Sequence, residues 1–223
     1  MTLHAVVFDF DGLIIDSEWA IFESALAAFE AHGHMLTVEA WSTIIGTTSD
    51  GVEDDWWASV CAASGVEGFE LAAFEAAYEA QDRSSRDQLP ALPGVVALID
   101  SLRAADVPLG IASSSSRGWL ERHVGRLGLV EHFGTLVGRD VVGGIGKPAP
   151  DVYLRACADL GADPSRSVAL EDSAHGATAA KAAGMAVVAI PGRITIHNDF
   201  SHVDLVVPSL ESLTVDALSA LVG

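Results

Sequence analysis

The feature that most constrains the fold is a short apolar strand near the N-terminus that ends in acidic residues. Val6, Val7 and Phe8 are consecutive apolar residues, which is typical of a strand buried on both faces inside a parallel sheet. Asp9 and Asp11 follow at once, although a carboxylate there is costly to remove from water and two nearby carboxylates repel each other. We therefore expect these aspartates to serve a chemical function at the end of the strand.

From about residue 95 onward, short apolar segments alternate with segments of helical periodicity. Strands that alternate with helices predict a parallel sheet covered on both faces. The predicted strands are residues 6–8, 107–112, 135–137, 167–170, 186–190 and 205–207. The predicted helices are residues 95–104, 113–128, 151–161 and 175–184, with a final one after Ser212. The expected fold class is α/β, with a Rossmann-like doubly wound parallel sheet as its core.

Residues 16–86 interrupt this pattern with a region of helical periodicity. Asp16 or Ser17 can cap its first helix, because short polar side chains satisfy the free N–H groups of a first turn. The other predicted helices of this region span residues 38–45, 50–63 and 71–78. We expect an α/β core formed by residues 1–15 and 87–223, with residues 16–86 as an inserted all-helical cap.

The composition argues against several classes of partner. The 223 residues carry a formal net charge of −19, which disfavours nucleic acid and anionic membranes. No apolar stretch approaches the roughly 20 residues that cross a membrane, and no signal peptide is predicted. Cys61 and Cys157 show no metal-binding spacing and suit buried free thiols. We expect a cytoplasmic protein, with the monomer as the default state.

The carboxyl ends of parallel strands share one edge of the sheet, where ligands of such folds bind. The polar segments at these ends are Asp9-Phe10-Asp11-Gly12, Ser113-Ser114-Ser115-Ser116, Gly146-Lys147-Pro148 and Glu171-Asp172-Ser173. Carboxylates that converge on one rim need a hard divalent cation, and ligation by oxygen alone suits Mg²⁺. A phosphate would then find Ser113 at a helix N-terminus and positive charge from Lys147. One aspartate could attack phosphorus while the other transfers protons.

The segments DFDG, ASSSS, GKPAPD and EDS resemble the four ordered motifs of the haloacid dehalogenase superfamily. The resemblance is to its phosphatase and beta-phosphoglucomutase-like branch, which carries a helical cap after the first strand, and it covers essentially the whole chain. It implies a small phosphorylated substrate, with Asp9 as nucleophile and Asp11 as general acid and base. The implied Mg²⁺ ligands are Asp9, Asp11 through its backbone carbonyl, Glu171 and Asp172, and the implied substrate-binding residues are Ser113, Ser114 and Lys147, the last also catalytic.

A Mg²⁺-dependent phosphatase is the favoured function among five. The dehalogenases that resemble this chain lack an aspartate at the place of Asp11, and the phosphonate-cleaving enzymes use a cap lysine, which residues 16–86 do not contain. A non-enzymatic phosphorylatable module needs no helical cap. The serious alternative is a phosphomutase of the beta-phosphoglucomutase type. Its cap arginine and hinge histidine correspond to Ser49 and Ile21 here, and no Lys or Arg precedes Arg83.

Overall fold

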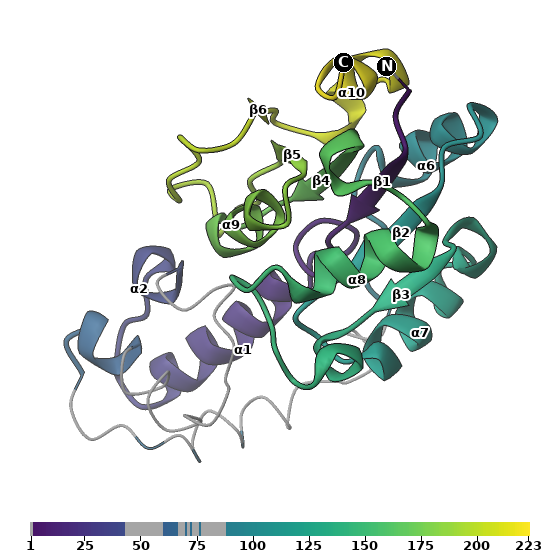
Figure 1. The fold of residues 1–223 in the computed structure, drawn as a ribbon. Coiled ribbons are helices and arrows are strands. Elements are labelled where there is room, and N and C mark those ends of the chain that lie inside the picture. Colours follow the sequence, from purple (N-terminus) through teal and green to yellow (C-terminus); the bar gives the residue numbers. More distant parts are fainter. Residues whose placement is uncertain (1, 43–59, 67–69, 71, 73–75, 77–87) are drawn as a thin grey trace.

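The structure, a computed structural model, describes residues 2–42, 60–66, 70, 72, 76 and 88–223. In these residues a six-stranded parallel sheet has the strand order β3-β2-β1-β4-β5-β6 (Figure 1). The strands are β1 (Ala5–Phe8), β2 (Leu109–Ala112), β3 (Thr135–Val137), β4 (Ser167–Glu171), β5 (Ala186–Ala189) and β6 (Leu205–Val206). The predicted α/β fold class with its parallel sheet is confirmed.

Helices connect the strands and supply the rest of the described structure. The α-helices are α1 (Ser17–Ala31), α2 (Val38–Ser42), α6 (Val95–Ala104), α7 (Arg117–Arg126), α8 (Asp151–Leu160), α9 (Ala174–Ala182) and α10 (Val215–Ala220). Short 3-10 helices are η1 (Val130–His132), η2 (Arg139–Val142), η3 (Pro164–Arg166) and η4 (Leu210–Ser212). The bounds of α6 agree with the prediction from the sequence.

Two predicted elements begin two or more residues later in the structure than the sequence predicts. The strand predicted over 107–112 begins at Leu109, because the N–H of Val107 donates back to the Leu102 carbonyl at 3.0 Å and Pro108 has no N–H to offer a neighbouring strand. The helix predicted from residue 113 begins four residues later. Ser116 caps it, and its Oγ accepts from the backbone N–H of Trp119 at 3.3 Å.

The alternation of side chains along the strands divides the core into two layers. Val6 and Phe8 of β1 face one side, where they pack with apolar residues of α6, α7 and α10. Val7 faces the other side and packs with residues of α8 and α9. All three β1 side chains are completely buried, as the apolar run predicts. Helices therefore cover both faces of the sheet.

Helices α1 and α2 lie apart from the sheet (Figure 1) and have a hydrophobic cluster of their own. Phe22 and Phe29 of α1 are buried in it together with Trp41 of α2. Ile194, from the loop after β5, also packs into this cluster and so ties the core to the helical region. The helix predicted over 38–45 is present as α2 in its described part, residues 38–42. The predicted helices over 50–63 and 71–78 fall largely outside the described residues, although residues 60–63 are helical as predicted.

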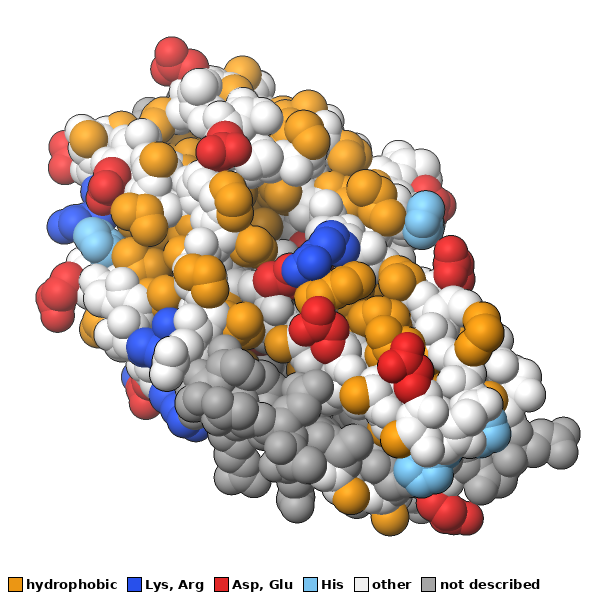
Figure 2. Space-filling view, turned by 180° about the vertical axis from the view of Figure 1, so that it is seen from behind, with side chains coloured by type: hydrophobic (Ala, Val, Ile, Leu, Met, Phe, Trp, Pro, Cys, Tyr) orange, Lys and Arg blue, Asp and Glu red, His pale blue; other side chains and the backbone are white. Residues whose placement is uncertain are grey.

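The composition led to expectations about membrane-spanning helices, surface charge and the two cysteines. None of the helices in the described ranges is long and apolar enough to cross a membrane. Acidic side chains are spread over the face shown in Figure 2, and Lys and Arg occupy few places on it. Cys61 and Cys157 are both buried free thiols, as predicted.

Candidate active site

Three carboxylates meet where β1 and β4 end at the same edge of the sheet. Asp9 follows β1, and its backbone N–H donates to the Leu170 carbonyl of β4 at 2.9 Å. Glu171 is the last residue of β4, and Asp172 follows it. One carboxylate oxygen each from Asp9, Glu171 and Asp172 lies within 4.8 Å of the others, and all three side chains are buried. The structure thus brings together the acidic residues that the sequence places at these strand ends.

Lys147 lies among these carboxylates and is only 3% exposed. Its Nζ donates to Asp9 Oδ1 at 2.5 Å and to Glu171 Oε1 at 2.5 Å. The Tyr153 hydroxyl of α8 donates to the same Glu171 oxygen at 2.6 Å, a contact that no motif in the sequence indicates. The second Glu171 oxygen accepts from the N–H and hydroxyl of Ser173 at 3.3 and 3.2 Å. Both oxygens of Glu171 are therefore engaged by protein donors.

Negative charge exceeds positive charge in this cluster. Burial raises the pKa of Asp9 to about 8, because the loss of water outweighs the attraction of Lys147 and the charge of Glu171 adds to the effect. Burial, followed by the charges of Asp9 and Glu171, also raises the pKa of Asp172. Burial lowers the pKa of Lys147, but the two carboxylates outweigh it and the net shift is upward. Three carboxylates around one ammonium group fit a hard divalent cation.

Two glycines allow the carboxylates to lie where they do. Gly12 has a φ of +86°, and a Cβ there would be 2.2 Å from Asp172 Oδ2. Gly176, in the first turn of α9, would place a Cβ 1.9 Å from Glu171 Oε1. Both distances are far below van der Waals contact. The glycine of the DFDG segment is therefore required both for its backbone conformation and for the space that Asp172 occupies.

Asp11 lies on the turn after β1 and accepts hydrogen bonds on both carboxylate oxygens. Its Oδ1 accepts from Ser17 Oγ at 2.7 Å and from Trp119 Nε1 at 3.0 Å. Its Oδ2 accepts from Ser115 Oγ at 2.6 Å and from Ser113 Oγ at 3.3 Å. All four donors are neutral. The sequence alone does not distinguish Ser115 from a simple helix cap, and its helical periodicity does not single out Trp119.

The serine segment after β2 lies against both Asp11 and the lysine loop. Ser113 is buried, and its Oγ also accepts from the N–H of Ser115 at 2.9 Å. The Oγ of Ser114 accepts from the backbone N–H of Lys147 at 3.2 Å, so that this hydroxyl holds the loop that carries the lysine. The segment therefore links three of the candidate residues, Asp11, Ser113 and Lys147, to one short stretch of backbone.

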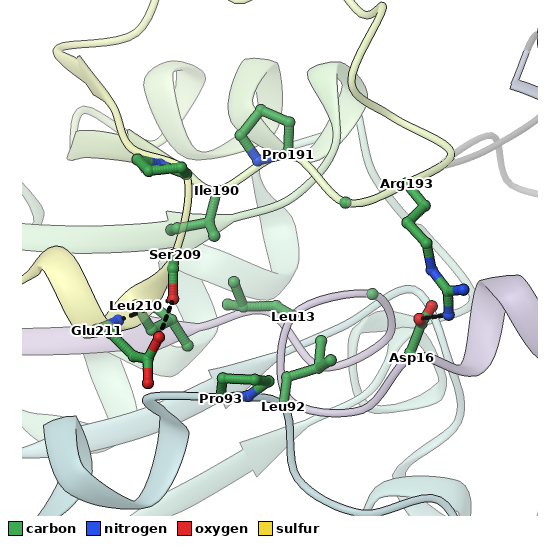
Figure 3. Close-up of a pocket in the computed structure, with 13 residues that line it drawn as sticks. Leu13, Asp16, Leu92, Pro93, Ile190, Pro191, Arg193, Ser209, Leu210 and Glu211 are labelled. Carbon is green, nitrogen blue, oxygen red and sulfur yellow. Dashed lines mark hydrogen bonds and ion pairs between the residues drawn. The ribbon is translucent and has the colours of Figure 1, made fainter.

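A cavity of about 420 Å³ lies beside this site, between the start of α1 and the linker that precedes α6 (Figure 3). At one end the carboxylate of Asp16 accepts from the guanidinium of Arg193, and the two side chains point toward each other. The same guanidinium carbon lies 4.1 Å from the centre of the Trp19 ring. Asp16 is the first residue before α1, but it makes no side-chain capping bond. The predicted cap is therefore wrong, because the distant Arg193 takes the carboxylate instead.

Comparison with known proteins identifies relatives across nearly the whole chain. Residues 6–190 match the family model described as haloacid dehalogenase-like hydrolase. YhcW of Bacillus subtilis (strain 168) is 33% identical over 203 residues, which cover 90% of this chain and 90% of that protein. Hexitol phosphatase B of Escherichia coli (strain K12) is 32% identical over 223 residues, which cover 96% of each chain.

A solved structure shows the same architecture. The crystal structure of a haloacid dehalogenase family hydrolase from Deinococcus radiodurans R1, with bound phosphate and sodium, superposes with a TM-score of 0.78. It is 28% identical in sequence, and the superposition covers 98% of this chain and 97% of that one. The similarity therefore includes the helical region as well as the sheet.

Proposed function

The chain belongs to the haloacid dehalogenase-like hydrolases and is a phosphoric monoester hydrolase, and from this premise we propose that it dephosphorylates a small metabolite through an aspartyl-phosphate on Asp9. The observation that supports this most directly is the position of the Asp9 carboxylate. It follows a buried strand, lies 2.5 Å from the Lys147 ammonium and stands beside Asp172. A carboxylate nucleophile needs a cation that offsets charge as an anionic phosphate approaches.

The proposed reaction has two steps. In the first, an oxygen of Asp9 attacks phosphorus, the bond from phosphorus to the ester oxygen breaks, and protonated Asp11 donates its proton to that oxygen. In the second, Asp11 removes a proton from water, the water oxygen attacks phosphorus, and the bond to Asp9 breaks. Inorganic phosphate leaves, and both aspartates return to their starting states. Lys147, Ser113 and Ser114 bind phosphoryl oxygens in both steps.

We propose Mg²⁺ as the cation of this site. The residues that would hold it are Asp9, Asp172 and the backbone carbonyl of Asp11. Glu171 fits a supporting place, since both of its oxygens already accept from protein donors. Bound there, Mg²⁺ would supply the positive charge that lets the carboxylates and a phosphate share one rim. The raised pKa values of Asp9 and Asp172 support this, because burial, with the neighbouring carboxylates adding to it, makes their charged forms costly unless a cation is present.

Residues 16–86 are proposed to act as a cap over the site, with residues 1–15 and 87–223 as the catalytic core. Because the chain has no Lys or Arg before Arg83, the proposed leaving group is neutral or cationic, such as a sugar or an amino alcohol. The similarity to a hexitol phosphatase supports a sugar phosphate or a related ester. The monomer remains the proposed state.

The phosphomutase alternative needs a second cationic site near the cap. Arg193 of the core reaches the start of α1, but its guanidinium is already bound to Asp16. Arg83, Arg86 and Ser49 lie outside the described residues. Losing one charge-assisted phosphate contact costs roughly 1.5–3 kcal/mol, and a mutase that anchors a bisphosphate needs several such contacts. The phosphatase is therefore the function we propose.

A panel of phosphorylated metabolites, assayed for released phosphate with Mg²⁺ and then with excess chelator, tests the proposal. We expect turnover of monophosphates with Mg²⁺, none with chelator, and label from a phosphorylated intermediate on Asp9 alone. Asp9→Asn should retain the fold and lose turnover, because the amide is isosteric but a poor nucleophile. Label on another residue contradicts the mechanism. Faster formation of glucose 6-phosphate than of free phosphate, from beta-glucose 1-phosphate with a bisphosphate activator, would establish the mutase instead.

A further inference from the structure

We infer that Trp119 is a positioning residue, whose indole N–H holds the Asp11 carboxylate in the orientation needed for proton transfer. This inference rests on the proposed function, in which Asp11 is the general acid and base. Trp119 lies on α7 of the core, and its Nε1 donates to Asp11 Oδ1 at 3.0 Å. The bond joins two residues that are 108 positions apart in the sequence.

The indole is itself held in place from two directions. Its ring centre lies 4.0 Å from that of His123, one turn later on α7, and His123 is completely buried. At the start of the helix, the Trp119 backbone N–H donates to Ser116 Oγ at 3.3 Å. A side chain that packs on a buried ring and sits in a capped first turn has little freedom to rotate. Trp119 therefore presents its N–H in a fixed direction.

The second oxygen of the carboxylate is held from the same segment of the core. Ser115 Oγ donates to Asp11 Oδ2 at 2.6 Å, so Ser115 and Trp119 together fix both oxygens. A carboxylate held at one oxygen can still turn about its terminal bond, whereas one held at both cannot. Ser17, the other close donor, belongs to α1 of the helical region. The core donors would keep Asp11 oriented if that helix moved.

The position of these donors predicts which step depends on them. Proton donation to the leaving oxygen requires the acid at hydrogen-bond distance and in the correct direction. A leaving group that is stable as an anion needs little of this help. Loss of the indole N–H should therefore slow the cleavage of esters with basic leaving groups, and slow others much less. A residue that merely stabilises α7 would affect both kinds of ester equally.

Trp119→Phe is the test variant, because it removes the N–H and keeps an aromatic ring beside His123. The probes are phenyl phosphate and para-nitrophenyl phosphate, which have similar shapes and leaving groups of different basicity. Release of the phenol in a single turnover, with enzyme in excess and Mg²⁺ present, reports the first step alone. Trp19→Phe is the matched control, since the Trp19 Nε1 donates at 2.7 Å to the exposed Glu23, one turn later on α1.

We expect Trp119→Phe to slow the release of phenol by about tenfold or more, within the roughly hundredfold or greater effect of a general acid. Release of para-nitrophenol should fall less than about threefold by the same reasoning, with substrate affinity unchanged. Ser115→Ala should show the same selectivity, and it decides the question if Trp119→Phe does not fold. Trp19→Phe should match the wild type.

Two results would overturn the inference while leaving the proposed function intact. One is an active wild type in which neither Trp119→Phe nor Ser115→Ala changes either rate. The other is an equal loss for both esters, which would show that the residues only support the fold. A wild type that releases phosphate from no ester in the panel would instead overturn the proposed function, and this inference with it.

Discussion

The packing around Glu171 predicts that a single methyl group at Gly176 disrupts the active site. A Cβ at this position would be 1.9 Å from Glu171 Oε1 and 2.1 Å from the carboxyl carbon, so the carboxylate would have to move. Glu171 has no room to do so, because it is completely buried and its Oε1 accepts from both Lys147 and Tyr153. Gly176→Ala should therefore break at least one of these charge-assisted bonds.

The expected loss follows from three opposing contributions. Alanine in a helix is better than glycine by about 0.5–1 kcal/mol, which favours the variant. Overpacking of a buried site costs about 1–3 kcal/mol, and a lost hydrogen bond to a charged group costs about 1.5–3 kcal/mol. The sum predicts that Gly176→Ala is destabilised by about 1.5–5.5 kcal/mol.

Gly118 provides a matched control. It lies in the first turn of α7, and a Cβ there would meet nothing within 4 Å. Gly118→Ala should therefore stabilise the protein by about 0.5–1 kcal/mol, the opposite sign for the same chemical change. Urea unfolding followed by tryptophan fluorescence measures both variants against the wild type. A Gly176→Ala protein as stable as Gly118→Ala, with unchanged turnover, would refute the tight packing of Glu171 against α9.

Two further predictions concern other carboxylates. Burial, with the charges of Asp11 and Asp16, raises the pKa of Glu18 from 4.5 to about 7. Its protonated form therefore contributes stability to the folded state that is fully present below about pH 4.5. This stability is lost as the pH rises through 7. Glu18→Gln should therefore stabilise the metal-free protein by about 3 kcal/mol at pH 8 and by nearly nothing at pH 4.5, as measured by urea unfolding; an equal effect at both values would contradict this. Asp172→Ala should raise the Mg²⁺ concentration needed for half-maximal turnover at least about tenfold, which corresponds to about 1.4 kcal/mol of lost Mg²⁺ binding. Substrate affinity at saturating Mg²⁺ should be nearly unchanged. The reverse pattern would contradict the proposed role of Asp172 as a ligand.

The sequence predicts the sheet and its polar edge well because both depend on local patterns. The run Val6–Phe8 is apolar on both faces, so it can only be a central strand, and the structure places β1 between β2 and β4. A polar residue directly after such a strand must lie at the carboxyl edge of the sheet. The proximity of Asp9 and Asp172 follows once β1 and β4 are known to be neighbours, a strand order that the local patterns do not specify.

The contacts that orient the site are not predictable in this way, because they join residues far apart in the chain. Trp119 resembles any apolar helix residue until Asp11 is seen beside it, and Tyr153 resembles any core tyrosine until Glu171 is. Asp16 shows the converse, since the local pattern predicts a helix cap. An arginine 177 residues away offers a charge-assisted pair, which is stronger than a bond to a neutral backbone N–H.

The two aspartates of the DFDG segment differ in their surroundings in a way that suits different tasks. Asp9 is buried and bound to a lysine, which offsets the charge that would build up as an anionic phosphate approaches it. Asp11 is more exposed and is held by neutral donors alone among the bonds that the described residues show. Neutral donors orient this carboxylate without placing a full positive charge beside it. In the proposed reaction, the lysine therefore suits Asp9 to nucleophilic attack, and the hydroxyls and the indole suit Asp11 to proton transfer.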